Sequence, residues 1–332
     1  MQMPIDKIQT DTLRILAELL PAGSTVALLD FPNHKNAGDH LIWEGEIQYI
    51  RDLGLKLAYV ADATRYSKAD LDHFIGPDGI VLIHGGGNFG DRWDEAQAFH
   101  ERIVDENHDR HVIQLSQGIE FQDGPRLERA QSVYGAHPNL TILIRDHVGF
   151  DDASRRFGKN DVRFCPDMAF GNKPIHGERG FTDVIYLKRT DSESVNASVV
   201  VVAPSIGHLV DDWGLTPVGE LLWIIYHVPG AVARRLPFTR RALFPIQARC
   251  YQAIARLNLR SAKRILGRGG IVLTDRLHAA VLGALMGKPV VALDNANGKV
   301  SAIIRDYLGT FPNVQYAPTA ADANRIMSEL LD

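Results

Sequence analysis

The chain has 332 residues, of which 45% are hydrophobic, so it can bury a large core, and its length favours two domains over one. Its 36 basic and 40 acidic side chains give a net charge of −4, which excludes a global attraction to nucleic acid or anionic lipid. The two cysteines, Cys165 and Cys250, form no CxxC pair and no metal-binding spacing, so neither a disulfide framework nor a structural zinc is predicted.

The first 20 residues predict an amphipathic helix rather than a secretory signal, because acidic side chains interrupt the apolar ones. The longest apolar run outside the predicted strands, residues 221–233, contains His227 and Pro229. It is shorter than the ~20 residues that a membrane-spanning helix needs. No transmembrane segment is predicted, and we expect a cytoplasmic protein.

Short apolar runs rich in β-branched residues alternate with helix-like segments along most of the chain. This alternation is typical of buried parallel strands in a doubly wound α/β fold. Nine such runs are too many for one small sheet. The predicted strands are residues 25–31, 57–61, 80–84, 112–116, 141–145, 184–187, 199–203, 271–274 and 290–294.

A segment rich in Gly, Pro and charge, residues 171–181, predicts the connection between two domains. We expect an N-terminal Rossmann-like domain at residues 1–172 and a C-terminal one at residues 173–332, facing each other across a cleft. The sequence GIVL occurs at the start of GIVLIHGGG (79–87) and of GIVLTDRLH (270–278). Two related halves would show such a repeat, although four residues also match by chance.

Residues 220–264 depart from the alternation. They have helical character and combine apolar runs with nine Arg and Lys side chains. We interpret them as a basic and apolar helical insertion in the second domain. Such a segment is either a solvated helix pair or a surface for an anionic membrane or ligand.

The predicted ligand site lies beyond the carboxyl ends of the strands, as in other open parallel sheets. After the strand at 25–31, polar residues 33–36 precede Asp39, which we expect at the N-cap of the next helix. After the strand at 80–84, three glycines precede Asn88 and Asp91 and can bring backbone close to a ligand. This loop matches neither GxGxxG nor a P-loop, which argues against a nicotinamide enzyme or an NTPase.

Two further strand ends add positive charge. Arg145 follows the strand at 141–145, and either projects into the cleft or forms a structural salt bridge with Asp146 or Asp167. In TDRLHAAVLGA (274–284), Thr274 or Asp275 is expected to cap a helix whose first turn contains Arg276 and His278. A helix N-terminus with a guanidinium and an imidazole favours an anion. The turn at residues 297–299 aims Lys299 toward the same anion.

Taken in order, these loops resemble the polysaccharide pyruvyl transferase family. The match runs from about residue 33 to residue 300. The fragments that match are NAGDHLIWEGE (36–46), HGGGNFGD (84–91), LSQGI (115–119), IRD (144–146), CPDMAF (165–170), TDRLHA (274–279) and NGK (297–299).

The resemblance implies a fold similar to the two-domain, GT-B type glycosyltransferases. It also implies that the pyruvyl unit of phosphoenolpyruvate moves onto two hydroxyls of a sugar as a cyclic ketal, with release of phosphate, in exopolysaccharide or cell-surface glycan synthesis. In the family the donor is bound by the residues that match Arg276, Leu277 and His278, and Arg145 is carried over from the short IRD match.

This chemistry suits the residues. Cationic side chains are needed to bind the carboxylate and the phosphate of the donor. A general acid such as His278 is needed to protonate its methylene carbon, and a carboxylate, Asp39 or Asp91, serves as the base that deprotonates the sugar hydroxyl. No cofactor and no metal is expected. The predicted donor-binding residues are Gly86, Gly87, Asn88, Arg145, Arg276, Leu277, His278 and Lys299.

Two other classes stay open. A nucleotide-sugar glycosyltransferase would use Arg276 and Lys299 to hold a diphosphate. A non-catalytic binding protein is disfavoured, since a decayed site should have lost some of these polar residues. As partners we expect phosphoenolpyruvate and a sugar or lipid-linked oligosaccharide, and no nucleic acid. Peripheral contact with the cytoplasmic face of the inner membrane would suit residues 220–264.

Overall fold

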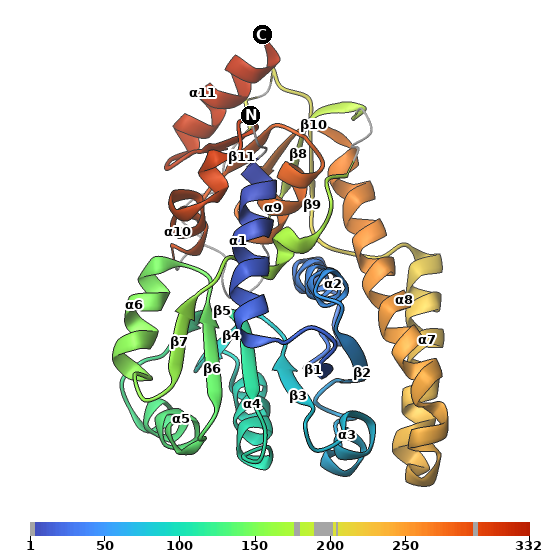
Figure 1. Cartoon of the computed structure of the whole chain (residues 1–332). Coiled ribbons are helices and arrows are strands. Elements are labelled where there is room, and N and C mark those ends of the chain that lie inside the picture. The colour runs from blue at the N-terminus through green and yellow to red at the C-terminus, as the bar shows by residue number, and fades with distance from the viewer. Residues whose placement is uncertain (1–3, 176–179, 189–201, 204, 295–297) are drawn as a thin grey trace.

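The computed structural model describes residues 4–175, 180–188, 202–203, 205–294 and 298–332 (Figure 1). The first half contains α1 (Pro4–Leu19), β1 (Thr25–Leu29), α2 (Ala37–Asp52), β2 (Lys56–Ala61), α3 (Lys68–Ile75), β3 (Ile80–Ile83), β4 (Gly86–Gly90), α4 (Asp94–Glu106), β5 (Val112–Glu120), α5 (Pro125–Ala136), β6 (Leu140–Ile144), α6 (His147–Arg156), β7 (Asp161–Phe164) and the 3-10 helix η1 (Met168–Gly171). The second half contains β8 (Thr182–Leu187), β9 (His208–Asp211), α7 (Pro217–Arg235), η2 (Pro237–Thr239), α8 (Arg240–Gly267), β10 (Gly269–Thr274), α9 (Leu277–Leu285), β11 (Val290–Ala292), α10 (Lys299–Asp306), η3 (Leu308–Thr310), β12 (Val314–Tyr316) and α11 (Ala320–Leu331).

The described strands form two sheets, and every described strand pair is parallel. The first sheet has seven strands in the order β2-β1-β3-β5-β6-β7, with β4 paired to β5, and the second has five in the order β9-β8-β10-β11-β12. The predicted α/β class with parallel strands is confirmed. The predicted strand at 199–203 falls mostly outside the described residues.

Four observed strands are missing from the nine predicted runs because they lack a long apolar run. They are β4, with the sequence GGNFG, β7, with the sequence DVRF, β9, with the sequence HLVD, and the three-residue β12. Each of them is stabilised by pairing with a neighbouring strand rather than by its own pattern.

The two halves share a topology. In both halves the first three strands of the sheet are arranged in the order second, first, third. The third strand therefore pairs with the first, which means that β3 pairs with β1 and β10 pairs with β8. The repeated GIVL sequence leads into these two equivalent strands. Each sheet therefore has a point where the strand order changes direction, beside β3 and beside β10. The predicted domain boundary at residue 172 lies between the two sheets and stays a prediction.

One apolar cluster joins the two halves. Trp43 and Tyr49 of α2, Phe170 of η1, Tyr251 of α8 and Leu282 of α9 all belong to it, and all are buried. The predicted helical residues 220–264 form α7 and α8, and α8 packs on α2 of the first half as well as on β8 and β10 of the second (Figure 1). Within the described part of the chain, no helix has the length and apolar character needed to cross a membrane.

Gly45 in the middle of α2 is required by this packing. A Cβ atom at this position would lie 1.9 Å from the carbonyl oxygen of Met168. Alanine normally favours a helix over glycine, but here we expect Gly45→Ala to lower the free energy of unfolding by about 1–3 kcal/mol. Gly267→Ala at the end of α8 is the control, since its Cβ would meet nothing within 4 Å. Equal urea midpoints for the two variants would contradict this assignment.

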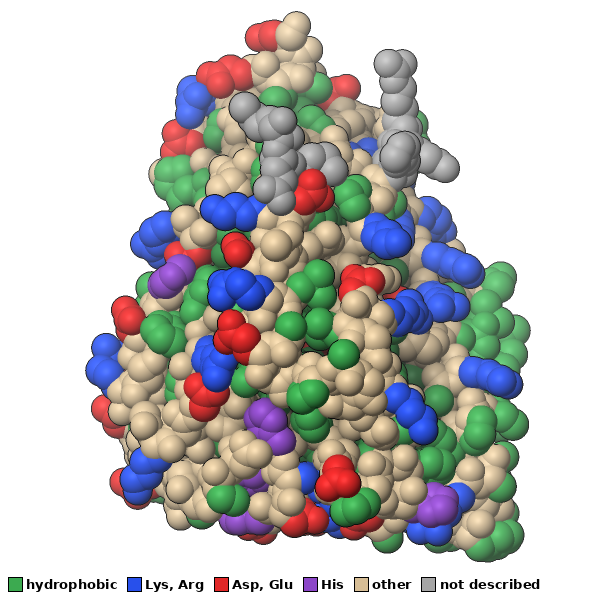
Figure 2. Space-filling view, viewed as in Figure 1, with side chains coloured by type: hydrophobic (Ala, Val, Ile, Leu, Met, Phe, Trp, Pro, Cys, Tyr) green, Lys and Arg blue, Asp and Glu red, His purple; other side chains and the backbone are tan. Residues whose placement is uncertain are grey.

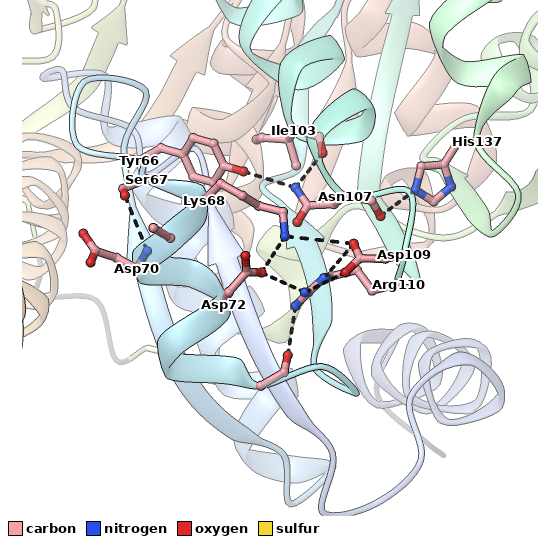
Figure 3. Close-up of polar contacts among 12 residues, drawn as sticks. Tyr66, Ser67, Lys68, Asp70, Asp72, Ile103, Asn107, Asp109, Arg110 and His137 are labelled. Carbon is pink, nitrogen blue, oxygen red and sulfur yellow. Dashed lines mark hydrogen bonds and ion pairs between the residues drawn. The ribbon is translucent and has the colours of Figure 1, made fainter.

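A polar cluster joins α3 to the segment that leads into β5 (Figure 3). Arg110 donates to Asp72 at 2.8 Å and to Asp109 at 3.2 Å, and Lys68 lies 2.5 Å from Asp72. Asn107 donates to the Tyr66 hydroxyl at 3.1 Å. The segment enters β5 at its amino end, opposite the ligand-binding edge, so we assign this cluster a structural role.

Candidate functional site

A cavity of about 850 Å³, the central cavity, is lined by residues of both halves. They come from the segments that follow β1, β3, β6, β9 and β10, at the carboxyl ends of these strands, and from β4 and the residues that follow it. Two of these strands, β3 and β10, flank the points where the strand order changes direction, where doubly wound sheets bind ligands. The predicted site residues that line it are Asp39, Gly87, Asn88, Arg145, Arg276, Leu277 and His278.

Asp167 connects two of these residues. Its Oδ2 atom accepts a hydrogen bond from Arg145 Nη1 at 2.9 Å and lies 3.3 Å from Nε2 of His278. Burial raises the pKa of Asp167, but the opposing effect of the positive charges on His278 and Arg145 is larger. The pKa of Asp167 therefore lies well below its usual range. An ionised carboxylate only accepts hydrogen bonds, so Nε2 of His278 bears hydrogen, and Nδ1 is the ring nitrogen that Asp167 does not contact.

Both alternatives for Arg145 therefore hold. The guanidinium forms the salt bridge with Asp167 and also lines the cavity, with only 4% of its side chain exposed. The salt-bridge partner of Arg145 is Asp167 rather than Asp146. Asp146 instead caps α6, where its Oδ1 accepts a hydrogen bond from Gly149 N at 2.7 Å. The Tyr307 hydroxyl fixes the backbone by donating to the carbonyl oxygen of Arg145 at 3.1 Å.

Arg276 itself occupies the N-cap position of α9, which corrects the predicted cap. The Oγ1 atom of Thr274 accepts from Arg276 N at 3.0 Å and donates to the carbonyl oxygen of Leu187 at 2.9 Å, so it ties β10 to β8. The Arg276 guanidinium donates to Asp212 at 2.8 Å. Asp212 follows β9, which the sequence did not predict, so this partner was missed.

Asp39 is not the N-cap of α2, because Asn36 has that role and accepts from Gly38 N at 3.1 Å. Asp39 lies instead in the first turn, where Asn36 Nδ2 donates to it at 2.8 Å. Burial raises the pKa of Asp39, but positive charge on His34, and then on His278, outweighs burial and the pKa is lowered. Asp39 is thus a carboxylate at neutral pH and faces the cavity.

The glycine-rich segment is a strand rather than a free loop. Gly86 has φ 127° and pairs with Gln117, and it does not line the cavity. Gly87 does, and a Cβ there would lie 3.7 Å from Nη2 of Arg145. Asn88 N donates to the Gln117 side chain at 3.3 Å.

Asp91 is not brought to the cavity. It follows β4, where its carboxylate accepts from Gln122 N at 2.6 Å, a contact that fixes the backbone. Lys299 begins α10, and its side chain and the neighbouring residue 297 fall outside what the structure describes.

A buried pair that the sequence did not reveal also borders the cavity. Nδ1 of His84 lies 2.7 Å from Oε2 of Glu46, and Gly85 N donates to Oε1 at 2.7 Å. Burial lowers the pKa of His84, but the charge of Glu46 and its hydrogen bond raise it above the usual value. Nε2 of His84 has no hydrogen-bond partner among the described residues. No spacing rule connects positions 46 and 84, although both fall in fragments singled out above.

His40 is a buried neutral histidine, because burial lowers its pKa to about 3 and its Nε2 donates to the His34 carbonyl oxygen at 2.8 Å. The unfolded chain takes up this proton near pH 6.5, so stability is lost as the pH falls below that value. Between pH 7 and pH 5 this group should cost about 2 kcal/mol. We expect His40→Gln to weaken the pH dependence of urea unfolding by that amount, whereas the exposed His73→Gln should leave it unchanged. An unaltered dependence in His40→Gln would refute this.

The fold and the cavity define a doubly wound α/β protein whose polar cavity is shared by its two halves. The chain belongs to the polysaccharide pyruvyl transferase family, whose sequence profile matches residues 36–297. It is accordingly an enzyme of the pyruvyl transferase type.

Individual relatives agree with this assignment. The chain is 32% identical to pyruvyl transferase 1 of Schizosaccharomyces pombe over 83% of this chain and 68% of that protein. It is 24% identical to the putative pyruvyl transferase EpsO of Bacillus subtilis over 95% of both chains. Its fold resembles the crystal structure of an uncharacterised protein of Klebsiella pneumoniae, with a TM-score of 0.60 at 19% identity over 94% of this chain and 99% of that one.

Proposed function

We propose that the protein transfers the pyruvyl unit of phosphoenolpyruvate onto two hydroxyls of a sugar and releases inorganic phosphate, in the synthesis of an exopolysaccharide or cell-surface glycan. The observation that supports this most directly is the Asp167 carboxylate, which holds a guanidinium, Arg145, and an imidazole, His278, at one cavity. A donor with two anionic groups and a carbon to be protonated uses both kinds of group.

Donor binding is assigned to cations on opposite sides of the cavity. Arg145 comes from the first half and Arg276 from the second, and each already holds one carboxylate. We add His84, whose Glu46 partner favours the protonated ring. Nε2 of His84 has no hydrogen-bond partner among the described residues, so its N–H is available to an anion in the cavity. The backbone at Gly87 leaves room for an anion beside Arg145.

The proposed reaction balances without a cofactor or a metal. His278 Nδ1 protonates the methylene carbon of the donor while one sugar hydroxyl bonds to its C2 atom and passes its proton to Asp39. The C2–oxygen bond to phosphate then breaks. The second hydroxyl bonds to C2 and closes the ketal ring, and its proton leaves with the phosphate. Asp91 is left out of this scheme because its carboxylate lies elsewhere.

The acceptor class and the likeness to GT-B glycosyltransferases are proposals of the same kind. Two doubly wound sheets that share a cavity suit that architecture. The same architecture keeps a nucleotide-sugar glycosyltransferase as the second candidate, in which the two arginines would bind a diphosphate. We further propose a sugar on a lipid carrier as the acceptor.

Incubation with phosphoenolpyruvate and a galactose- or glucose-terminated acceptor tests the proposal. We expect acceptor-dependent release of phosphate and a product in which an acid-labile pyruvate ketal is detected by mass spectrometry. EDTA should leave the rate unchanged. Release of a nucleoside diphosphate from a nucleotide sugar, with no turnover of phosphoenolpyruvate, would establish the second candidate instead.

A further inference from the structure

The outward face of α7 is apolar, the reverse of an ordinary surface helix. Three residues of α7, Gly219, Gly230 and Ala233, are buried. On the opposite side the large side chains are apolar and 38% to 68% exposed, and Phe238 in the connection to α8 is 83% exposed. In Figure 2 these side chains lie along the right edge of the molecule. The residues of this outward face are Val218, Leu221, Ile224, Ile225, Val228 and Val232.

Positive charge surrounds this outward face. Residues 217–267 contain nine Arg or Lys side chains against one Glu, a net charge of +8 in a chain whose net charge is −4. Arg234, Arg235 and Arg249 are exposed, and no ion pair within the described part of the chain engages them. Helical geometry places Arg235 one turn beyond Val232 on the same face.

The inner face of α7 covers the loop that lines the central cavity. Nε2 of His227 lies 2.5 Å from the Asn33 side-chain oxygen. Lys35 lies 2.5 Å from Glu220 and 5.8 Å from the centre of the Trp223 ring. Asn33 and Lys35 both line the cavity. A binding partner that covers the outward face of α7 would therefore lie close to the cavity.

We propose that the outward face of α7, together with the arginines around its C-terminal end, docks on a lipid bilayer with anionic headgroups. Interfacial helices of this kind insert apolar side chains at the boundary between headgroups and acyl chains while basic residues contact the headgroups. A second copy of the chain fits less well, because it would bring two faces of net positive charge together. Docking of this face on the bilayer would bring the central cavity close to an acceptor sugar on a lipid carrier. This conclusion about the acceptor rests on the proposed function.

Sedimentation of the full chain with phosphatidylcholine vesicles, with and without phosphatidylglycerol, tests the docking. We expect binding only when phosphatidylglycerol is present, and weaker binding at high salt. Ile224→Glu with Val228→Glu should reduce the bound fraction at least tenfold. Arg234→Gln with Arg235→Gln should reduce it by roughly tenfold or more, as each arginine contributes about fivefold. Val148→Glu, 63% exposed on α6, is the matched control and should bind like the wild type.

No wild-type binding to the phosphatidylglycerol vesicles, or unchanged binding of both α7 variants, would overturn the proposal. So would a dimer seen by light scattering that Ile224→Glu with Val228→Glu dissociates, because the face would then be an interface between copies. The vesicle assay uses neither donor nor acceptor, so its result is independent of the proposed reaction. Transfer to a soluble acceptor should be the same in all of these variants.

Discussion

His278→Ala is expected to lower kcat for phosphate release by about 10²–10⁴-fold, the range that general acid catalysis contributes. The variant loses the imidazole that protonates the donor carbon, while Arg145 still neutralises Asp167. The fold should be retained, since His278 lies at the start of α9 with 14% of its side chain exposed. Phosphate release at saturating donor measures the change, and circular dichroism melting checks the fold.

Asp167→Asn provides the companion measurement. Asparagine has no negative charge to hold Nε2 of His278, so the imidazolium should lose a stabilising partner. The alkaline limb of the pH–rate profile, where the general acid loses its proton, should therefore shift to lower pH. A residue with only a structural role would change the melting temperature without moving the profile. Near-normal turnover in His278→Ala would rule the histidine out as the acid.

Arg276→Ala is expected to raise the donor KM roughly 10- to 100-fold with a smaller change in kcat. The guanidinium contacts an anion in the ground state as well as in the transition state, and a hydrogen bond to a charged group contributes about 1.5–3 kcal/mol. Steady-state kinetics with varied phosphoenolpyruvate measures both constants. The result also distinguishes the role of Arg276 from that of His278, because loss of His278 should lower kcat.

Asp212→Asn is the control for Arg276→Ala, because it removes the carboxylate that holds Nη2 but keeps the guanidinium. If Asp212 only positions Arg276, this variant should raise the donor KM less than Arg276→Ala does. An unchanged KM in Arg276→Ala would move donor binding to Arg145 and His84.

Much of the fold followed from local pattern. Buried parallel strands need apolar runs, so β1, β3 and β10 were visible in the sequence, and their carboxyl ends had to meet at one edge of each sheet. This is why loops far apart in the chain, after β1 and after β10, were expected to lie close together, and residues of both loops do line the central cavity. The glycine run was less informative, since it forms β4.

The partners of the site residues could not be predicted. Asp167 and His278 are 111 positions apart and Arg276 and Asp212 are 64 apart, so their pairing depends on how the two halves pack. Asp30 was also missed. It lines the cavity with φ 68°, which few residues other than glycine adopt, and His100 holds its carboxylate at 2.8 Å.

The apolar cluster that α2, η1, α8 and α9 share has a consequence for motion. Many enzymes built from two lobes close on their substrates by swinging the lobes about a flexible joint. Here such a swing would open the stacked contact of Tyr251 with Phe31 and separate α9 from α2, and the apolar surface exposed would cost ~25 cal/mol per Å². We therefore expect the two halves to move together as one body, with substrates reaching the central cavity without a wide hinge opening.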